Sequence, residues 1–256
     1  MLDLDKQSAA KLFGEATVPL NVRKHSDVIQ ISNSISFLQR KIYNVLLKHA
    51  YPDLATQRIH RMKMSKLKEM LEIDSYNYEY IEESVKSLMK TTVRWSIVDQ
   101  SKDAFGITTL LAAVRYRGGV IEYEFAQMLV DKLYEPATYG IIDIKLQNQL
   151  TSKYSLALYE NAVRFLAEGR SDVIALEDFY DLLGISRQLE FKYAKRDCIN
   201  PALREINQTS DLRVEIEYHK RGKKVVGAQI LVDINDGKYV GDPALLMEGL
   251  IGGGEG

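Results

Sequence analysis

The sequence predicts an α+β fold made of two similar halves, each with helices followed by a β-hairpin. In the second half, residues 191–207 (FKYAKRDCINPALREIN) carry apolar residues at the three- and four-residue spacing of a buried helix face. Two alternating strands follow, joined by the basic turn 220–224 (KRGKK). The first half repeats this order, which indicates an internal duplication. A basic helix before a hairpin with a basic tip is the layout of a winged helix, so we predict two tandem winged-helix domains.

The first half contains the signals of several helices and a hairpin. Ser34 and Ser36 are candidate N-caps of the first helix, which Pro52 closes. Ser65 is the expected N-cap of the second helix. The glycines at 118–119 predict a tight hairpin turn. We expect helices over residues 35–50, 65–73, 77–90 and 125–133, and strands over 27–32, 59–64, 93–97, 106–117 and 120–125.

The second half has clearer boundaries. Ser152 is the expected N-cap of a long helix that ends at Gly169, and a shorter helix over 176–183 ends at Gly184. Pro201 lies inside the helix described above, where a proline predicts a kink. The first strand of the hairpin alternates, and its apolar face carries Leu212, Val214, Ile216 and Tyr218.

Composition excludes several classes of protein. The chain has 256 residues, 46% of them hydrophobic and 27% charged, as in globular proteins. Its single cysteine, Cys198, fits a reducing compartment and a small buried residue rather than a reactive thiol. No apolar run approaches the roughly 20 residues of a membrane span, and the N-terminus carries acids where a signal peptide is basic. We therefore expect a cytoplasmic protein without membrane contact.

The signals of an enzyme are missing from the sequence. The sequence has no glycine-rich loop ending in Gly-Lys-Ser/Thr. Its four histidines are scattered, without the paired spacing of metal ligands. We expect no catalytic residues, no metal site and no cofactor.

The second half carries two basic patches that fit DNA. The formal net charge is only −1, so a DNA surface requires uneven placement of charge. Because phosphate contacts supply most of the affinity, cations must gather on one surface, although a charged patch is more often simply solvated. Lys195 and Arg196 are the candidates for reading bases, and the hairpin tip for holding the backbone. The candidate DNA-binding residues here are Arg187, Lys192, Lys195, Arg196, Lys220, Arg221, Lys223 and Lys224.

The first half is less suited to DNA. Its third helix carries Glu79, Glu82 and Glu83, and carboxylates repel phosphate. DNA contact would then be limited to the helix end, for which Asn77 and Tyr78 are the candidates. Alternatively, the strands of this half form a dimer interface. Basic residues also gather in this half, at Arg58, Arg61, Lys63, Lys66 and Lys68.

The segments LTSKYSLALYENAVRFL, FKYAKRDCINPALREIN, DLRVEIEYHKRGKKV and QILVDI resemble the plasmid replication initiators of the Rep_3 family. The resemblance is most specific over residues 151–234 and looser over the first half. It implies two pseudo-symmetric winged helices that bind double-stranded DNA, at origin repeats (iterons) and at the gene's own operator. It also implies monomers that recruit the host replication initiator and replicative helicase, and homodimers joined through the first domain that act as autorepressors. One departure is Asp197, where several relatives continue the basic run.

From these observations we predict three segments. Residues 1–140 are an N-terminal winged-helix domain for dimerisation and auxiliary DNA contact. Residues 141–235 are the C-terminal winged helix and main DNA-binding domain. Residues 236–256 are an acidic, glycine-rich, flexible tail. Two other functions fit the same fold: a transcriptional regulator that binds one operator, and a protein-interaction scaffold that binds no DNA.

Overall fold

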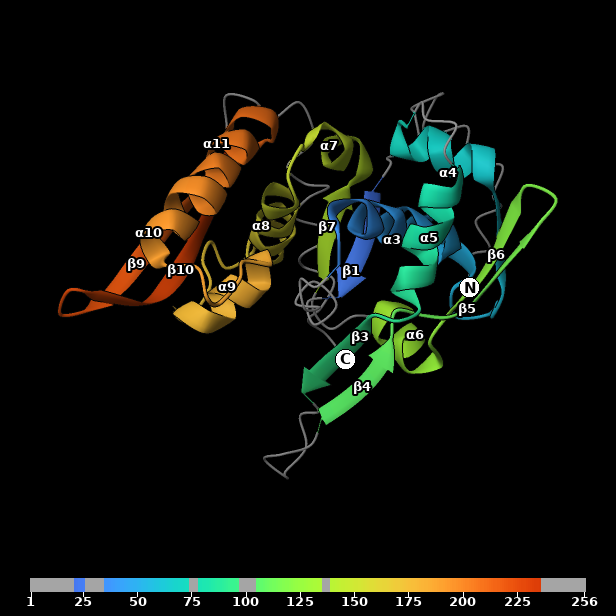
Figure 1. Cartoon of the computed structure of the whole chain (residues 1–256), viewed down its shortest axis with the longest axis horizontal. Coiled ribbons are helices and arrows are strands. Elements are labelled where there is room, and N and C mark those ends of the chain that lie inside the picture. Colours follow the sequence, from blue (N-terminus) through green and yellow to red (C-terminus); the bar gives the residue numbers. More distant parts are fainter. Residues whose placement is uncertain (1–20, 26–34, 74–77, 97–104, 135–138, 236–256) are drawn as a thin grey trace, which may run out of the picture.

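The computed structural model of this chain describes residues 21–25, 35–73, 78–96, 105–134 and 139–235 (Figure 1). The expected strand over 27–32 and the tail over 236–256 lie outside these residues. The elements of the first half are β1 (Asn21–His25), α3 (Phe37–Ala50), β2 (His60–Lys63), α4 (Met64–Leu71), α5 (Tyr78–Leu88), β3 (Thr92–Ser96), β4 (Phe105–Thr109), β5 (Leu111–Arg117), β6 (Val120–Phe125) and α6 (Gln127–Tyr134).

The second half begins with a strand and a short helix where the sequence suggested only a junction. Its elements are β7 (Tyr139–Asp143), α7 (Ile144–Gln149), α8 (Lys153–Arg164), β8 (Ile174–Ala175), α9 (Leu176–Leu183), α10 (Phe191–Ala194), a π turn (Lys195–Ile199), α11 (Asn200–Thr209), β9 (Leu212–Arg221) and β10 (Lys224–Ile234). Strand β7 pairs antiparallel with β1, so the first described strand of each half meets the other in one small sheet.

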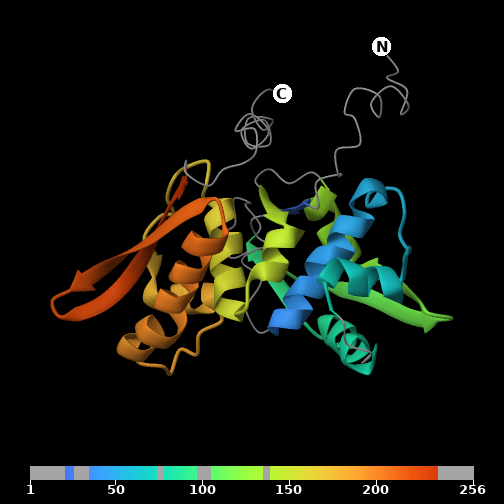
Figure 2. The same ribbon diagram turned by 90° about the horizontal axis from the view of Figure 1, so that it is seen from above.

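The two halves have the same sheet topology. In each, a short strand pairs with the second strand of the hairpin, giving the orders β2-β6-β5 and β8-β10-β9. All of these pairings are antiparallel. The helices of each half pack on one face of its sheet, and the hairpins extend toward opposite ends of the molecule (Figures 1 and 2). This repeated arrangement is the predicted pair of winged helices.

The expected caps give the starts of α3 and α8 and the end of α9, but α8 ends at Arg164 and not at the expected Gly169. Ser36 begins α3 with a reciprocal capping box to Gln39, and Ser152 accepts a hydrogen bond from the backbone of Ser155 at the start of α8. Gly184 ends α9 with φ +68°. Ser65 is a wrong prediction, because α4 begins one residue earlier and Lys63 stands at its N-cap without a side-chain hydrogen bond.

One expected strand is two strands. Residues 106–117 divide at Leu110, which is fully buried, into β4 and β5. Strand β4 pairs with β3 rather than continuing along β6. The first half therefore carries a separate two-stranded sheet beside its three-stranded one, and this sheet projects from the body of the domain (Figure 1).

A buried polar network joins α3 and α8, the longest described helix of each half. Arg40 of α3 donates to Glu160 of α8 at 2.6 Å, and their side chains are 4% and 0% exposed. Asn44 donates to Glu160 at 2.8 Å and to Gln147 of α7 at 2.7 Å. Because an isolated charge is costly to bury, Arg40 and Glu160 stabilise only the arrangement that keeps them together.

Two helices of different halves share one face of the molecule. In Figure 2, α5 and α10 lie on the same side of the molecule, although they belong to different halves. The helices at the positions expected to read DNA therefore lie on one side of the molecule.

The buried Arg40–Glu160 pair predicts a large loss of stability when one of its charges is removed. We expect Glu160→Gln to lower the free energy of unfolding by about 3 kcal/mol or more, because Arg40 keeps its buried charge but loses the charged carboxylate of Glu160. Chemical denaturation measures this. The matched control is Glu215→Gln, which breaks the exposed Arg213–Glu215 pair and should cost under about 1 kcal/mol. Equal losses in the two variants would contradict a structural role of the buried pair.

Candidate nucleic-acid interface

The helix over 191–209 buries one face and exposes the other. Ala194, Cys198 and Ile206 face the core, while Lys192 and Arg196 are exposed. The ring of Phe191 packs edge-on against Tyr218 of β9, with 5.0 Å between the centroids. This ring contact holds the start of the helix against the hairpin.

Pro201 lies in the first turn of α11, just after a widened turn of the helix, rather than in the middle of a regular α-helix. Proline has no N–H to donate to the carbonyl four residues earlier. The segment Lys195–Ile199, just before α11, forms a π turn, in which the N–H of Asn200 bonds to the carbonyl of Lys195. Single π turns are common at functional sites, and this one contains Arg196.

Arg196 is held by two neighbours. Its Nε donates to Asp197 Oδ1 at 2.6 Å, and its Nη2 donates to Oδ2 at 2.8 Å. Its guanidinium carbon lies 5.1 Å from the ring centroid of Tyr193. The hydrogen bonds raise the pKa of Arg196 and lower the pKa of Asp197 from their ordinary values. Both side chains are exposed, so the guanidinium is oriented and also open to a ligand.

The two lysines of this helix contact aromatic rings. Lys195 Nζ lies 4.6 Å from the ring centroid of Tyr218, and Lys192 Nζ lies 5.8 Å from that of Tyr193. Burial raises the pKa of Tyr218 to about 12, so this phenol is neutral at physiological pH. Arg187 is different, because its guanidinium pairs with Asp181 and Glu177 of α9. Of the predicted residues before α11, Arg187 therefore has the least free charge.

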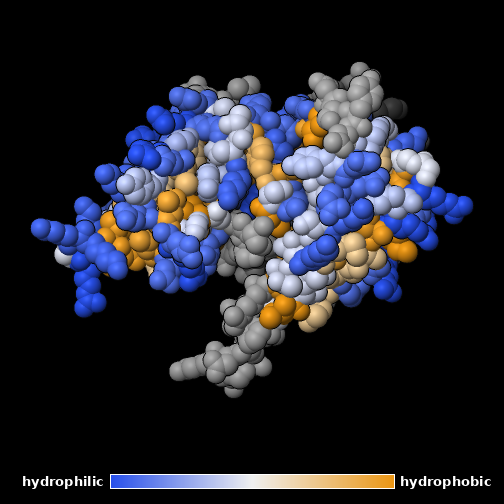
Figure 3. Space-filling view, in the orientation of Figure 1, coloured by the Kyte–Doolittle hydropathy of each residue, from blue (hydrophilic) through white to orange (hydrophobic). Residues whose placement is uncertain are grey.

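The hairpin tip carries free positive charge. The turn between β9 and β10 contains Gly222 with φ +63°, a conformation that favours glycine. All four predicted cations of this tip are exposed, and among the described residues no carboxylate pairs with them. Figure 3 shows hydrophilic side chains over this tip at the left edge of the molecule. We call Lys220, Arg221, Lys223 and Lys224 the wing cations.

The corresponding surface of the first half is largely neutralised. Arg58 pairs with Glu124, and both Arg61 and Arg115 pair with Glu122. Hydrogen bonds from the two arginines lower the pKa of Glu122. The glutamates lie on β6, the strand that corresponds to β10 in the second half. This hairpin therefore offers phosphate much less free charge than the wing cations do.

Tyr78 is the first residue of α5 and is 43% exposed, whereas Asn77 lies outside the described residues. Lys68 Nζ lies 4.9 Å from the Tyr78 ring centroid. The phenol ring lines a cavity of about 500 Å³ between α5 and the hairpin turn, together with Glu82, Tyr116 and Arg117. Tyr78 therefore stands where helix and hairpin of this half meet.

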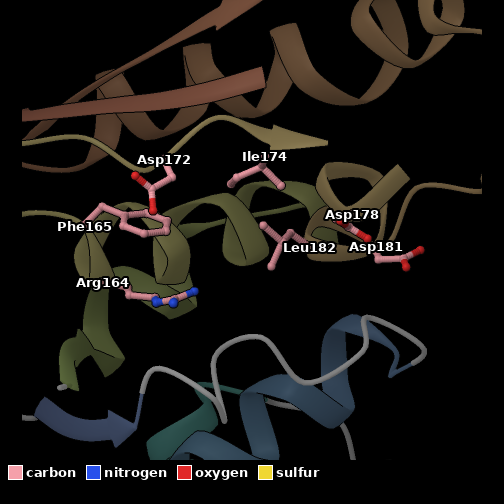
Figure 4. A pocket seen from close by; sticks show the side chains of 7 residues that line it. All are labelled: Arg164, Phe165, Asp172, Ile174, Asp178, Asp181 and Leu182. Atoms are coloured by element: carbon pink, nitrogen blue, oxygen red, sulfur yellow. The ribbon is translucent and has the colours of Figure 1, made fainter. Parts of the chain in front are cut away.

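A second cavity, of about 400 Å³, lies between the end of α8 and α9 (Figure 4). Its polar walls are acidic, with Asp172, Asp178 and Asp181, and Arg164 lies over the ring of Phe165. Such a lining does not suit phosphate. Among the described residues, no group of three or more His, Cys, Asp or Glu side chains is placed to hold a metal ion. No helix within the described ranges is long and apolar enough to cross a membrane.

Comparison with protein families decides between the architectures that share this topology. A family model described as "Initiator Replication protein, WH1" matches residues 21–163, and one described as "Initiator Rep protein, WH2" matches residues 175–231. The chain belongs to the Rep3 family of replication initiators. The resemblance found in the sequence is thereby confirmed, as are the two tandem winged helices.

One solved structure supports the fold of this Rep3 chain. The crystal structure of the Pi initiator protein in complex with iteron DNA matches with a TM-score of 0.63 and 13% identity, over 85% of this chain and 98% of that one. Two crystal structures of domains 2 and 3 of RctB match with TM-scores of 0.42 and 0.40 and 12% identity, over 82% of this chain and 85% of each. A search of curated protein sequences found no match.

Sequence reasoning did not single out the partners of the cations. Tyr193 precedes Arg196 by three residues, a spacing at which side chains meet on a helix, so this contact could have been predicted from the sequence. Asp197 was noted only as an interruption of the basic run. The contact of Tyr218 with Lys195 crosses from hairpin to helix and had no local signal.

The free charge of the wing predicts a uniform effect on DNA affinity. We expect Lys223→Ala to weaken binding to every sequence and to lower the slope of log K against log salt by about one unit. Fluorescence anisotropy at several salt concentrations measures this. Arg213→Ala, at the far end of the same hairpin, makes the same change in charge and should leave the slope unchanged. An unchanged slope in Lys223→Ala would remove the wing from the interface.

Proposed function

We propose that this chain initiates plasmid replication by binding iterons through its C-terminal winged helix. The observation that carries the proposal is that one domain holds two kinds of cation, the wing cations on its hairpin and Arg196 on the helix that contacts this hairpin. The wing cations are unpaired and suit phosphates, whereas Arg196 is oriented and suits a base edge. The Pi initiator protein, which has the same fold, was crystallised in complex with iteron DNA, and this supports repeats as the ligand.

In this proposal the N-terminal domain makes weaker DNA contact. Its hairpin arginines are paired with Glu122 and Glu124, and α5 exposes Glu79 and Glu83. Carboxylates at the surface repel phosphates, so contact would centre on the start of α5, at Asn77 and Tyr78. Because α5 and α10 share a face, both domains can meet the same duplex (Figure 2).

We further propose that the N-terminal domain joins two copies into the dimer that represses the chain's own gene. The β3–β4 sheet has only two strands, and β-sheet edges are templates for pairing with another chain. On β4, Ile107 is 53% exposed. Monomers on the iterons would then recruit the host initiator and the replicative helicase.

The deciding experiment is a salt titration of binding to the DNA upstream of the chain's own gene, beside scrambled DNA of equal length. Footprints that appear stepwise along tandem direct repeats would support the initiator. Protection of one inverted repeat alone would indicate a transcriptional regulator. Equal, weak binding to both DNAs at physiological salt would overturn specific recognition and favour a protein-interaction scaffold.

Arg196→Ala should reduce affinity for the repeat and relax sequence preference. A bidentate arginine–guanine contact contributes about 1–3 kcal/mol of discrimination, and we expect a loss of this size on the repeat. Scrambled DNA should be bound almost as well as by the wild type. Equal losses on repeat and scrambled DNA would reassign Arg196 to the phosphate backbone.

Ile107→Lys should shift the protein from dimer to monomer, because it places a charge in the proposed apolar contact. Sedimentation velocity across a concentration series measures the shift. Val173→Lys is the matched control, since Val173 is 54% exposed and lies in the other domain. If both variants dimerise like the wild type, the β3–β4 sheet is not the interface.

A further inference from the structure

The side chain that interrupts the basic run, Asp197, is placed to orient a DNA-reading arginine. In a chain that binds phosphates, an exposed carboxylate on the reading helix is at first sight a defect. Its two oxygens, however, both accept hydrogen bonds from Arg196, at 2.6 and 2.8 Å. The side chains of adjacent residues do not usually face one another on an α-helix, and this pair forms in the π turn.

The hydrogen bonds to Asp197 leave free the N–H groups of Arg196 that a guanine contact requires. A guanidinium has five N–H groups, and Asp197 takes one on Nε and one on Nη2. Three remain, two on Nη1 and one on Nη2. One N–H from each of these two nitrogens points outward from the end of the fork, which is the arrangement that meets guanine O6 and N7.

Tyr193 holds the same guanidinium from a second direction. The ring is 39% exposed and lies 5.1 Å from the guanidinium carbon of Arg196. A carboxylate against one edge and a ring against the group restrict both the position and the tilt of the fork. Arginine otherwise gives up much rotamer freedom when it binds, so a fork that is already oriented loses less.

We propose that Asp197 and Tyr193 are positioning residues that make Arg196 a reader of one guanine. The proposal rests on the proposed DNA-binding function and adds to it how the base is chosen. Asp197 also cancels the charge of Arg196, which lowers attraction to phosphates of any sequence. The Arg196–Asp197 pair thus lowers the affinity for DNA of any sequence and increases the discrimination between bases.

The test uses the full-length protein and duplexes of the repeat that the wild type protects upstream of its own gene. Single guanines are replaced by 7-deazaguanine, which lacks only the N7 acceptor. The wild type should lose about tenfold in affinity at one guanine. Arg196→Ala should show no loss at that guanine, which assigns the contact to this side chain.

Asp197→Asn removes the charge but keeps the shape of the side chain. We expect it to bind scrambled DNA at least as tightly as the wild type, while the ratio of repeat to scrambled affinity falls by about tenfold. The 7-deazaguanine effect should shrink to about threefold or less. Glu215→Gln, which breaks an exposed arginine–carboxylate pair at the far end of the hairpin, should leave both quantities unchanged.

Tyr193 is tested by a conservative and a disruptive change. Tyr193→Phe keeps the ring and should retain the discrimination, whereas Tyr193→Leu should lose much of it. If Tyr193→Phe loses as much as Tyr193→Leu, the hydroxyl acts instead and the positioning role of the ring is overturned.

The outcomes separate the two proposals. Wild-type protein that does not prefer its repeat would overturn the proposed function and, with it, this assignment. A preference that Asp197→Asn leaves intact would overturn only the assignment, and the Arg196–Asp197 contact would then be an ordinary surface ion pair.

Discussion

The buried pair of Arg40 and Glu160 is the contact that holds the first half of the chain against the second. It joins α3 to α8, the longest described helix of each half, and Asn44 donates to the same carboxylate and to Gln147. A buried ion pair adds little stability compared with an apolar contact, but it penalises every arrangement in which the charges separate. Helices in an apolar contact can slide past one another at lower cost. The polar network therefore favours one orientation, in which α5 and α10 share a face and the hairpins diverge (Figure 2).

Ion pairing, rather than the number of cations, separates the two domains. The first half contains as many basic residues near its hairpin as the second. In the first half, Arg58, Arg61 and Arg115 meet glutamates of β6, whereas no carboxylate pairs with the wing cations among the described residues. The difference lies in the facing strand: β6 carries Glu122 and Glu124, while residues 225–228 of β10 are apolar or glycine. A near-neutral chain can thus hold a strongly basic end.

Local signals predicted the elements, and contacts distant in sequence explain the errors. Capping serines predicted the starts of α3 and α8, and Gly184 predicted the end of α9, because a cap is a contact within a few residues; Gly169 did not predict the end of α8, which ends at Arg164. The pairing of β1 with β7 was not predicted, since the partners are over a hundred residues apart. The prediction of Ser65 as an N-cap was wrong because the hairpin turn contacts the start of α4. The N–H of Met64 donates to the carbonyl of Gly119. In the candidate interface, the sequence identified the cations but not their partners. Whether a cation is free depends on residues such as Asp181 and Tyr218, which belong to other elements.

In the proposed interface, the unpaired wing cations supply affinity and the oriented Arg196 supplies sequence discrimination. Four wing cations, if each meets a phosphate, give a salt slope of roughly 3–4 units, which is modest for a DNA-binding protein. Affinity of this origin is the same for every sequence and falls steeply with salt. Discrimination must then come from groups whose positions are fixed before binding, because a flexible arginine contacts wrong bases and phosphates almost as readily as the right base. Arg196 is fixed in this way by Tyr193 and Asp197. A further lysine in place of Asp197 would add phosphate affinity and remove that constraint. The acidic residue in the basic run is therefore consistent with selection for recognition of a particular repeat over tight binding to DNA in general.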